Sequence, residues 1–395
     1  MINELEIIGR EEELFSNDLI NFDSEVNIKI NSSKFLVIGA GGSIGQAVTK
    51  EIASRNPKSL HCIDINENAL AELVRDIRSS NFHIKDLKTF VVDIGSEYFV
   101  DFINSSDKFD YILNLSAMKH VRSEKDPYSL MRMIDTNIFY TKKSVELAIA
   151  SGTKNYFCVS TDKAANPVNL MGASKKIMEL YLSKFSDLVD ITSARFANVA
   201  FSNGSLLESF SNRLNNRQPI AGPSDIERYF VTTKESGILC MLSCLLGKDK
   251  EIFFPKLSKN LRLISIEEVA SKFLASQGFK IFSCSSEEEA KSINIDDLIN
   301  KNLWPCYFSS SNTSGEKSFE EFFTNEEDIF LQKFEDIGIV KNKINISEAK
   351  LVEFEKSITD IKKSTAKKQD IVLAFNKVLD NFQHIEKSKN LDEKM

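Results

Sequence analysis

Short apolar runs alternate with amphipathic stretches along the first half of the chain. Between residues 34 and 200, runs rich in β-branched and aromatic residues are separated by segments with helical periodicity. This alternation predicts a parallel sheet with helices on both faces, a doubly wound Rossmann-type α/β fold. The expected strands lie near 35–39, 60–64, 88–92, 110–115, 155–160 and 191–195, and the expected helices include 44–54, 67–79 and 130–151.

The rest of the chain has a different pattern. Helices are expected near 205–215 and 233–246 and a short strand near 251–254, whereas the last segment is rich in Lys and Glu with apolar positions at helical spacing. The predicted parts are an N-terminal extension (1–33), a Rossmann domain (34–200) to which some later segments return, a smaller mixed α/β domain (201–325) and a helical C-terminal extension (326–395).

The end of the chain allows three arrangements. For residues 346–395 these are a helical hairpin docked on the body, a contact with another subunit or partner, and a disordered tail. The final run, 386–395, is polar and is expected to fray.

A glycine-rich turn lies directly after the first expected strand. Gly39, Gly42 and Gly45 form a G-x-x-G-x-x-G pattern, with Ser43 and Ile44 at the start of a helix. A tight turn, close approach of backbone to a pyrophosphate, and close helix–strand packing each need a residue without Cβ. The helix N-terminus also offers free N–H groups to phosphates. We interpret this loop as dinucleotide-binding; the alternative is a glycine-rich surface turn.

An acidic residue ends the second expected strand. Asp64 lies 19 residues after Gly45. A carboxylate at this place accepts hydrogen bonds from both ribose hydroxyls, which favours NAD over NADP. The sequence therefore predicts NAD as the cofactor, unless the acidic residue is incidental.

Polar residues gather at the end of the fifth expected strand. The stretch Ser160–Lys163 reads Ser-Thr-Asp-Lys, and a later helix carries Met171 and Lys175. Open α/β sheets place ligands at the carboxyl ends of their strands. Asp162 and Lys163 are therefore expected there as an acid and a base, and a surface ion pair is the alternative.

Taken together, these segments resemble the extended short-chain dehydrogenase/reductase group. Within it they are most similar to the nucleotide-sugar 4,6-dehydratases of capsule and flagellin glycosylation, which act on UDP-N-acetylglucosamine. The resemblance covers roughly residues 34–325. Further segments that match in order are Asp64–Leu70, Asp93–Ile94, Ala117–Val121, Thr136–Asn137, Arg195–Val199, Asn203–Ser205, Arg228–Phe230, Glu251–Lys256 and Gly315–Lys317.

The resemblance implies a role for each candidate residue. Lys163 would remove the C5 proton, Asp162 would protonate the C6 oxygen, and Thr161 would orient the 4-hydroxyl, while Lys175 would hold the nicotinamide ribose. The implied cofactor-binding residues are Gly39, Gly42, Ser43, Ile44, Gly45, Asp64, Asp93, Ile94, Asn137, Lys175 and Val199. The implied substrate-binding residues are Lys119, Asn198, Ser205 and Arg228, with bracing of the Glu227 region as the alternative for Arg228.

The implied reaction removes water from the sugar. Hydride passes from C4 to NAD, the C5 proton and the C6 hydroxyl leave, and hydride returns to C6. A lysine acts as a base near neutral pH only if its pKa is depressed, and we expect Lys175 and burial beneath the substrate to lower the pKa of Lys163. A 4-epimerase or reductase needs no acid/base pair at C5 and C6 and is the alternative, as is an NAD-binding protein without catalysis.

Several positions depart from the family pattern. Met171 stands where most of the superfamily has Tyr, as in some dehydratases of this family, and the usual base for the sugar hydroxyl is thereby removed. Thr161 and Asp162 both stay open as its replacement. The usual Thr before the glycine loop is Ile38, and the usual Arg-Pro before Gly-Glu-Lys is Thr313–Ser314.

Composition narrows the classes of protein that remain possible. The chain has 395 residues, of which 42% are hydrophobic and 27% charged, and its net charge of −7 argues against general nucleic-acid binding. Its six cysteines form no C-x-x-C pair, so we expect buried free thiols and no metal site. No targeting signal and no apolar stretch of about 18 residues is evident, so a cytoplasmic protein without a membrane span is expected.

The expected partners are a UDP-sugar substrate and further copies of the same chain. Dimers in the resembled superfamily often pair the helix that carries the active-site lysine. The apolar residues that would form this face are Ile177, Met178, Leu180 and Tyr181.

Overall fold

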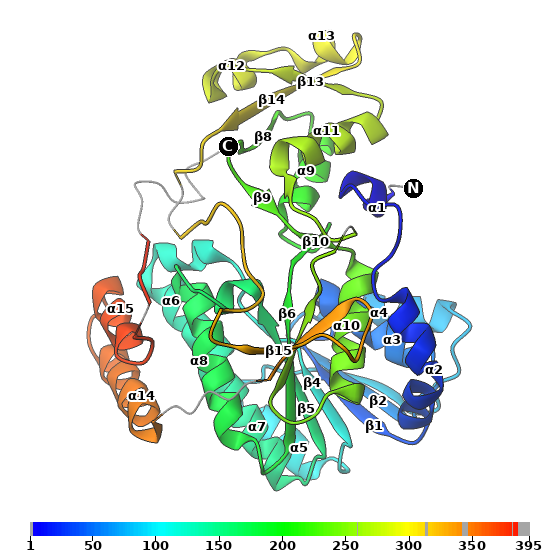
Figure 1. The fold of residues 1–395 in the computed structure, drawn as a ribbon, viewed down its shortest axis with the longest axis vertical. Coiled ribbons are helices and arrows are strands. Elements are labelled where there is room, and N and C mark those ends of the chain that lie inside the picture. The colour runs from blue at the N-terminus through cyan, green and yellow to red at the C-terminus, as the bar shows by residue number, and fades with distance from the viewer. Residues whose placement is uncertain (1–2, 259, 313–314, 342–346, 381, 386–395) are drawn as a thin grey trace.

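A nine-stranded sheet forms the centre of the computed structural model, which describes residues 3–258, 260–312, 315–341, 347–380 and 382–385 (Figure 1). The strand order is β15-β16-β11-β6-β5-β4-β1-β2-β3. All neighbours from β11 to β3 are parallel, whereas β16 and β15 are added antiparallel at one edge. The strands are β1 Lys34–Ile38, β2 Ser59–Asp64, β3 Leu87–Val91, β4 Tyr111–Asn114, β5 Asn155–Thr161, β6 Asp190–Phe196, β11 Glu251–Pro255, β15 Asp328–Phe330 and β16 Ile337–Lys341.

Successive residues of β1 face opposite sides of this sheet. Phe35 and Val37 belong to one buried cluster, and Leu36 and Ile38 belong to another. Each cluster is closed by helices, as expected for strands that are apolar on both faces. The helices on the first side are α2 Ser16–Asn31, α3 Ser43–Ala53, α4 Glu67–Ser79 and α10 Thr233–Leu246, and those on the second are α5 Glu97–Ser105, α7 Tyr140–Ala150 and α8 Leu170–Phe185.

The predicted doubly wound fold is confirmed, and each expected strand and helix of the first 255 residues is found within a few residues of its predicted bounds. One difference concerns the single helix expected at 130–151. It is divided into α6 Pro127–Ile134 and α7 by a π-helical turn, Asp135–Phe139. Such turns are frequent at functional sites, and here Asn137 bonds to a neighbouring loop and to α8.

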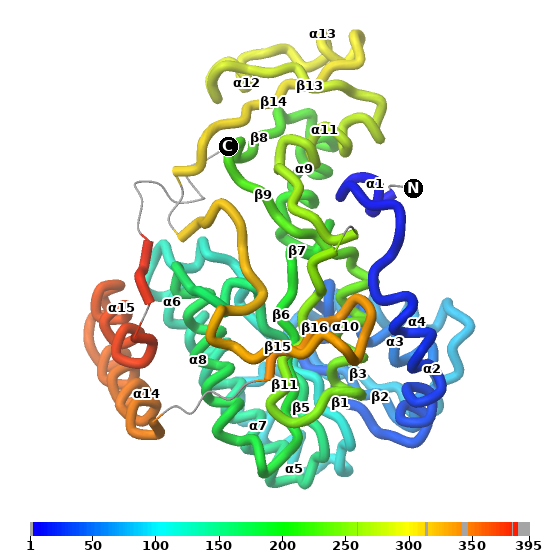
Figure 2. The backbone as a smooth tube through the Cα atoms, viewed as in Figure 1, coloured from blue at the N-terminus to red at the C-terminus, as the bar shows by residue number. Residues whose placement is uncertain are grey.

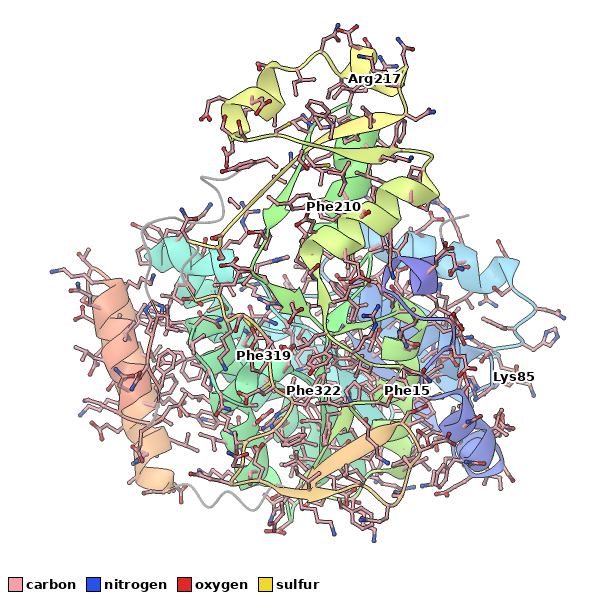
Figure 3. All side chains as sticks on the ribbon, turned by 45° about the horizontal axis from the view of Figure 1, so that its top comes forward. Phe15, Lys85, Phe210, Arg217, Phe319 and Phe322 are labelled. Carbon is pink, nitrogen blue, oxygen red and sulfur yellow. The ribbon has the colours of Figure 1, made fainter. Side chains whose placement is uncertain are left out.

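A smaller body of mixed structure lies at the top of Figures 1 and 2. Its apolar centre includes Phe210, labelled in Figure 3, together with Phe273 and Trp304. Its elements are the parallel sheet β13-β14-β8 (Lys280–Ser283, Leu303–Ser309, Ile220–Pro223) and helices α1 Glu4–Ile7, α9 Leu206–Asn215, α11 Ile266–Ser276, α12 Glu287–Ser292 and α13 Ile295–Ile299. Two strand pairs carry the chain to and from it, β7 Asn198–Val199 with β10 Phe230–Val231, and β9 Glu227–Arg228 with β12 Ile264–Ser265.

The C-terminal part begins with strands and continues as two helices. Residues 326–395 were predicted as a helical extension, but β15 and β16 within them extend the central sheet. The two helices are α14 Glu348–Lys363 and α15 Lys368–Asn376, and both pack against the main body. Of the three arrangements expected for this segment, the structure has the docked helical hairpin. Residues 386–395, which were predicted to fray, lie outside the described residues, and so do Thr313 and Ser314.

These two helices cover the face that the sequence assigned to a subunit contact. Ile177, Leu180 and Tyr181 on α8 share one buried cluster with Phe354 of α14 and Phe375 of α15. Met178 points the other way, into the cluster beneath the sheet. The chain thus buries this apolar face against its own C-terminal helices.

The cysteines lie inside the protein, as predicted. All six are buried and free, so they act as apolar packing groups. Within the described residues there is no cluster of three or more His, Cys, Asp or Glu side chains suited to a metal ion. No helix in the described ranges is both long and apolar enough to cross a membrane.

Candidate active site

The glycine loop lies at the point where the sheet order reverses. β1 pairs with β2 on one side and with β4 on the other, and all three end at the same edge. Gly39 has a φ of +78°, and a Cβ there would lie 2.7 Å from the Ser116 backbone nitrogen beyond β4. The turn therefore requires glycine for its conformation and for its contact with the next loop. Ligands of open α/β sheets bind in this crevice.

The other two glycines of the motif serve different needs. A Cβ at Gly45 would clash with the carbonyl oxygen of Gly39, so close packing of α3 on the loop excludes any side chain. A Cβ at Gly42 would meet nothing nearer than that same oxygen at 3.6 Å, so the protein itself leaves room beside it. Gly42 is also the N-cap of α3 and has no capping side chain. The open side and the uncapped N–H groups of Ser43 and Ile44 fit a phosphate-bearing ligand.

Asp64 is held at the end of β2 by backbone donors. Its Oδ2 accepts a hydrogen bond from Gly41 N at 2.8 Å, and its Oδ1 accepts one from Asn66 N at 2.9 Å. A carboxylate oxygen has two lone pairs, so both oxygens keep capacity to accept from ribose hydroxyls. The arrangement fits the adenosine side of a dinucleotide, with the carboxylate fixed before the ligand arrives.

Other predicted cofactor residues are occupied by contacts within the protein. Asp93 accepts from Gly95 N and from the Arg132 guanidinium, at 2.8 and 2.9 Å. Burial alone would raise the pKa of Asp93, but these donors outweigh it and the pKa is lowered. The neighbouring Ile94 is buried in the cluster under the sheet.

Asn137 is fully buried in the π-helical turn. Its amide bonds to both backbone groups of Met118, at 2.9 and 3.0 Å, and donates to Ser174 Oγ of α8 at 3.0 Å. It therefore fixes the loop after β4 against α8. Val199 is buried on β7, where the Asn198 backbone N–H donates to Tyr229 O at 3.0 Å and the Asn198 side chain donates a longer bond of 3.4 Å to the same oxygen.

The Ser-Thr-Asp-Lys stretch ends β5 at the same sheet edge as the glycine loop. Asp162 is buried, and its Oδ1 accepts from Thr161 Oγ1 at 2.9 Å, Lys163 N at 2.8 Å and Lys163 Nζ at 3.0 Å. Gly172 of α8 lies against the Lys163 carbonyl oxygen, where a Cβ would clash, so α8 begins directly beside this stretch. The structure thus brings together Thr161, Asp162 and Lys163 as one hydrogen-bonded group.

A second carboxylate lies near Lys163. Glu320, in the loop after β14, is buried with its Oε1 3.8 Å from Lys163 Nζ. Phe322, labelled in Figure 3, anchors this loop because it packs in the main core against Phe254 and Tyr229. Sequence reasoning missed Glu320, although it lies three residues after the matched Gly-Glu-Lys segment.

The pKa of Lys163 is shifted in the direction opposite to the prediction. Burial on its own lowers the pKa of Lys163, but the Asp162 and Glu320 carboxylates outweigh it, and the pKa is raised despite nearby Arg228. The prediction that Lys175 depresses this pKa is wrong, because the Lys175 ammonium points elsewhere. In the resting structure Lys163 is an ammonium ion paired with carboxylates.

Lys175 and Met171 lie on α8. The Lys175 ammonium is buried and donates to Val159 O at 3.1 Å, and burial lowers its pKa, although Cys158 and Glu179 oppose the shift. Met171 is buried in the apolar cluster that includes the C-terminal helices, and its N–H donates to Glu124 Oε1 at 2.9 Å. A buried cation beside a strand carbonyl can exchange that carbonyl for another acceptor.

The predicted substrate residues are spread around the same edge. Lys119 is half-buried with its Nζ 3.4 Å from Ser202 Oγ, and burial lowers its pKa. Ser205 caps α9 by accepting from Glu208 N. Arg228 donates to the carbonyl oxygens of Glu227, Lys317 and Ser318 at 2.9–3.1 Å, which are the contacts of the bracing alternative.

A separate groove of about 1120 Å³ runs between α8 and the C-terminal helices. It is lined by residues such as Asn166, Lys176 and Lys317. None of the predicted site residues lines it, so the groove and the sheet-edge site are distinct features.

Comparisons with known proteins found a matching family model and similar sequences. A family model described as a polysaccharide biosynthesis protein matches residues 35–342. An uncharacterized membrane protein of Methanocaldococcus jannaschii is 30% identical over 363 residues, which cover 86% of this chain and 96% of that protein. An inverting UDP-N-acetylglucosamine 4,6-dehydratase of Campylobacter jejuni is 26% identical over 274 residues, 67% of this chain and 78% of that enzyme.

Longer relatives and solved structures are also similar. The capsular polysaccharide biosynthesis protein CapD of Staphylococcus aureus is 26% identical over 65% of this chain, which spans only 43% of that protein. The structure of Pen from Bacillus thuringiensis has a TM-score of 0.66 at 23% identity, covering 80% of this chain and 89% of that one. A dTDP-glucose 4,6-dehydratase from Streptomyces venezuelae, solved with NAD bound, has a TM-score of 0.57 at 16% identity, covering 84% and 97%. At these identities the structures support the fold alone.

Proposed function

Because this chain belongs to the polysaccharide biosynthesis protein family, we propose that it is a nucleotide-sugar-modifying enzyme of the dehydratase and epimerase type. Its reaction, in this proposal, is the NAD-dependent 4,6-dehydration of UDP-N-acetylglucosamine. The observation that carries the choice of reaction is the buried Asp162–Lys163 pair at the end of β5. It lies at the edge of the sheet where the glycine loop also lies.

The glycine loop and Asp64 are the residues that would hold NAD. Gly42 leaves space for the pyrophosphate, the start of α3 offers N–H groups, and Asp64 offers carboxylate oxygens to the ribose. Lys175 would reach the nicotinamide ribose by giving up its bond to Val159 O. A nicotinamide bound there supplies the reversible hydride transfer that first oxidises C4 and finally reduces C6.

The Asp162–Lys163 group would handle the protons. Once C4 is a ketone, the C5 proton becomes acidic, and the Lys163 amine is the proposed base that removes it. That proton would pass along the Lys163–Asp162 hydrogen bond, and Asp162 would deliver it to the C6 oxygen as the C6–O bond breaks and water leaves. Thr161 donates to Asp162 in the resting structure, and in this proposal its hydroxyl would orient the 4-hydroxyl of the sugar.

Epimerisation at C4 is the main competitor, since it shares the fold, the cofactor and the first oxidation. It does not need a proton donor and acceptor aimed at C5 and C6. A lysine paired with buried carboxylates adds little net stability, so its presence at a ligand-binding edge of the sheet favours a catalytic role. The pair therefore favours dehydration.

The test is NMR of the purified protein with UDP-N-acetylglucosamine in deuterated water. We expect a 4-keto-6-deoxy product with deuterium at C5. Lys163→Ala should reduce its formation by at least about a thousandfold, because the base is lost, while NAD binding measured by fluorescence titration persists. Lys154→Ala is the matched control, since Lys154 precedes the opposite end of β5 and is exposed.

Two outcomes would contradict the proposal. A product epimeric at C4, with the 6-hydroxyl retained, would assign the enzyme to the epimerases. Full turnover by Lys163→Ala would remove Lys163 from the role of base.

A further inference from the structure

Lys163 is shared by two carboxylates that come from distant parts of the chain. Asp162 Oδ1 lies 3.0 Å from Lys163 Nζ. Glu320 Oε1, in the loop after β14, lies 3.8 Å from the same nitrogen. The Glu320 side chain is 4% exposed and that of Lys163 is 19% exposed, so water screens the pair weakly. The proposed base is thus charged at rest and has two possible acceptors for its extra proton.

The two carboxylates are bonded very differently. Asp162 Oδ1 accepts three hydrogen bonds, from Thr161 Oγ1, Lys163 N and Lys163 Nζ. Among the described residues, none donates a hydrogen bond to the Glu320 carboxylate within 3.5 Å. The Asp162 oxygen that faces Lys163 is therefore already occupied by donors, whereas the Glu320 carboxylate has room to accept a proton.

Burial acts on Glu320 in the same direction. Burial raises its pKa, and the nearby charge of Asp162 adds to the shift, against the opposing charges of Lys163, Arg228 and Lys317. Arg228 is occupied by three carbonyl oxygens and by Glu316 at 3.6 Å, so its charge is shared with that carboxylate. The charged groups around the pair leave Glu320 as a buried acid that is more easily protonated than an exposed one.

We propose that Glu320 accepts the proton that the Lys163 ammonium must lose before its amine can act as the C5 base. An N–H bond of Lys163 breaks and an O–H bond of Glu320 forms, so a +1/−1 pair becomes a neutral pair and no other reactant is needed. This inference rests on the proposed function. Glu320 acts through Lys163 and is a positioning and proton-accepting residue.

A shared proton gives the pair a distinct pH dependence. The charged pair and the neutral pair hold the same number of protons, so the fraction in the reactive neutral form does not change with pH between the two apparent pKa values of the pair. Without Glu320, the Lys163 ammonium has to lose its proton to solvent. The reactive fraction then grows with pH until the lysine itself has titrated.

The experiment compares pH profiles of kcat for the wild type, Glu320→Gln and Glu320→Asp. The wild type and Glu320→Asp should be flat across neutral pH, since both keep a carboxylate. Glu320→Gln should be slower at pH 7 and should gain about tenfold per pH unit as the pH rises. Glu321→Gln is the matched control, because this neighbour is exposed and should keep the flat profile.

A structural role would give a different result. If Glu320→Gln only lowered kcat by one factor at every pH, Glu320 would not be the proton acceptor. A wild-type profile that already rises tenfold per pH unit would also overturn the inference.

A titration without substrate separates this inference from the proposed function. The Lys163 signal is followed by NMR in protein labelled at the lysine ε-carbon and assigned with Lys163→Arg. Glu320→Gln should lower the pKa of Lys163 relative to the wild type, because a nearby negative charge is removed, and Glu321→Gln should not. An unchanged pKa overturns the inference. A lowered pKa together with a wild type that yields no dehydrated sugar supports the pair and contradicts the proposed reaction.

Discussion

The glycine loop and the charged group around Lys163 lie at the same sheet edge but are built in opposite ways. The loop is made by backbone within a few residues, since Gly39 and Gly45 contact each other across one turn. The charged group needs Asp162 and Lys163 from the end of β5, Arg228 from β9 and Glu320 from the loop after β14. A site made by one local turn can be recognised from its sequence, whereas charge states depend on residues that folding brings together.

Lys163 and Lys175 also show that a charge state depends on the surroundings that folding creates. The pKa of Lys163 is raised because two carboxylates outweigh burial, and the pKa of Lys175 is lowered because burial dominates. The Lys163 side chain is 19% exposed, whereas Lys175 is only 3% exposed. The carboxylates beside Lys163 add to this difference, so burial and charged partners together decide which lysine is the charged one.

The largest effect is expected from breaking the loop. Gly45→Ala should lower the free energy of unfolding by about 3 kcal/mol, because its Cβ would overlap the Gly39 carbonyl oxygen in a tightly packed region. Gly42→Ala should change stability by less than about 1 kcal/mol, yet weaken NAD binding at least about tenfold, because its Cβ points into open space. Chemical denaturation and NAD titration measure both. Equal loss of stability in the two variants would show that Gly42 serves packing instead of a ligand.

Local pattern was enough for the central fold. The expected strands and helices between Lys34 and Pro255 follow from apolar runs that alternate with amphipathic stretches, and the ordered motifs led to the correct family. Helix caps such as Asn66 and Asn169 bond within three residues, so their signal is local too. The strands β15 and β16 were missed because they reach the sheet only after a long excursion through the smaller body.

The site was only partly predictable for the same reason. Thr161, Asp162 and Lys163 are adjacent in sequence, and their contact was expected. Glu320 lies 157 positions beyond Lys163, and no spacing rule connects them. The helices α14 and α15 were recognised as amphipathic, but only the structure shows that they cover the face of α8 that was assigned to a subunit contact.

A second prediction breaks the charged group itself. Lys163→Met removes the cation from two buried carboxylates, which leaves Asp162 and Glu320 with only Arg228 and Lys317 as nearby positive charges. We expect the free energy of unfolding at pH 7 to fall by about 2 kcal/mol and to recover as the pH falls and the carboxylates are protonated. Denaturant unfolding between pH 4 and pH 8 measures this. A stability loss that is constant across this range would mean that lost packing, not unpaired charge, is responsible.

The smallest effect has the opposite sign and concerns Lys175. Burial lowers the pKa of Lys175 in the folded state, whereas the pKa of an unfolded lysine is about 10.4. Between these two pKa values the unfolded state binds more protons than the folded state. The free energy of unfolding therefore rises with pH in that range. Lys175→Met removes the cost of burying this lysine and should stabilise the fold by about 1 kcal/mol at pH 7, a gain that disappears as the pH approaches 10. The matched control is Lys176→Met, which loses ion pairs to Glu327 and Glu179 and should give no gain. If Lys175→Met were destabilising at pH 7, the bond to Val159 O would outweigh burial, and the contrast between the two lysines would not hold.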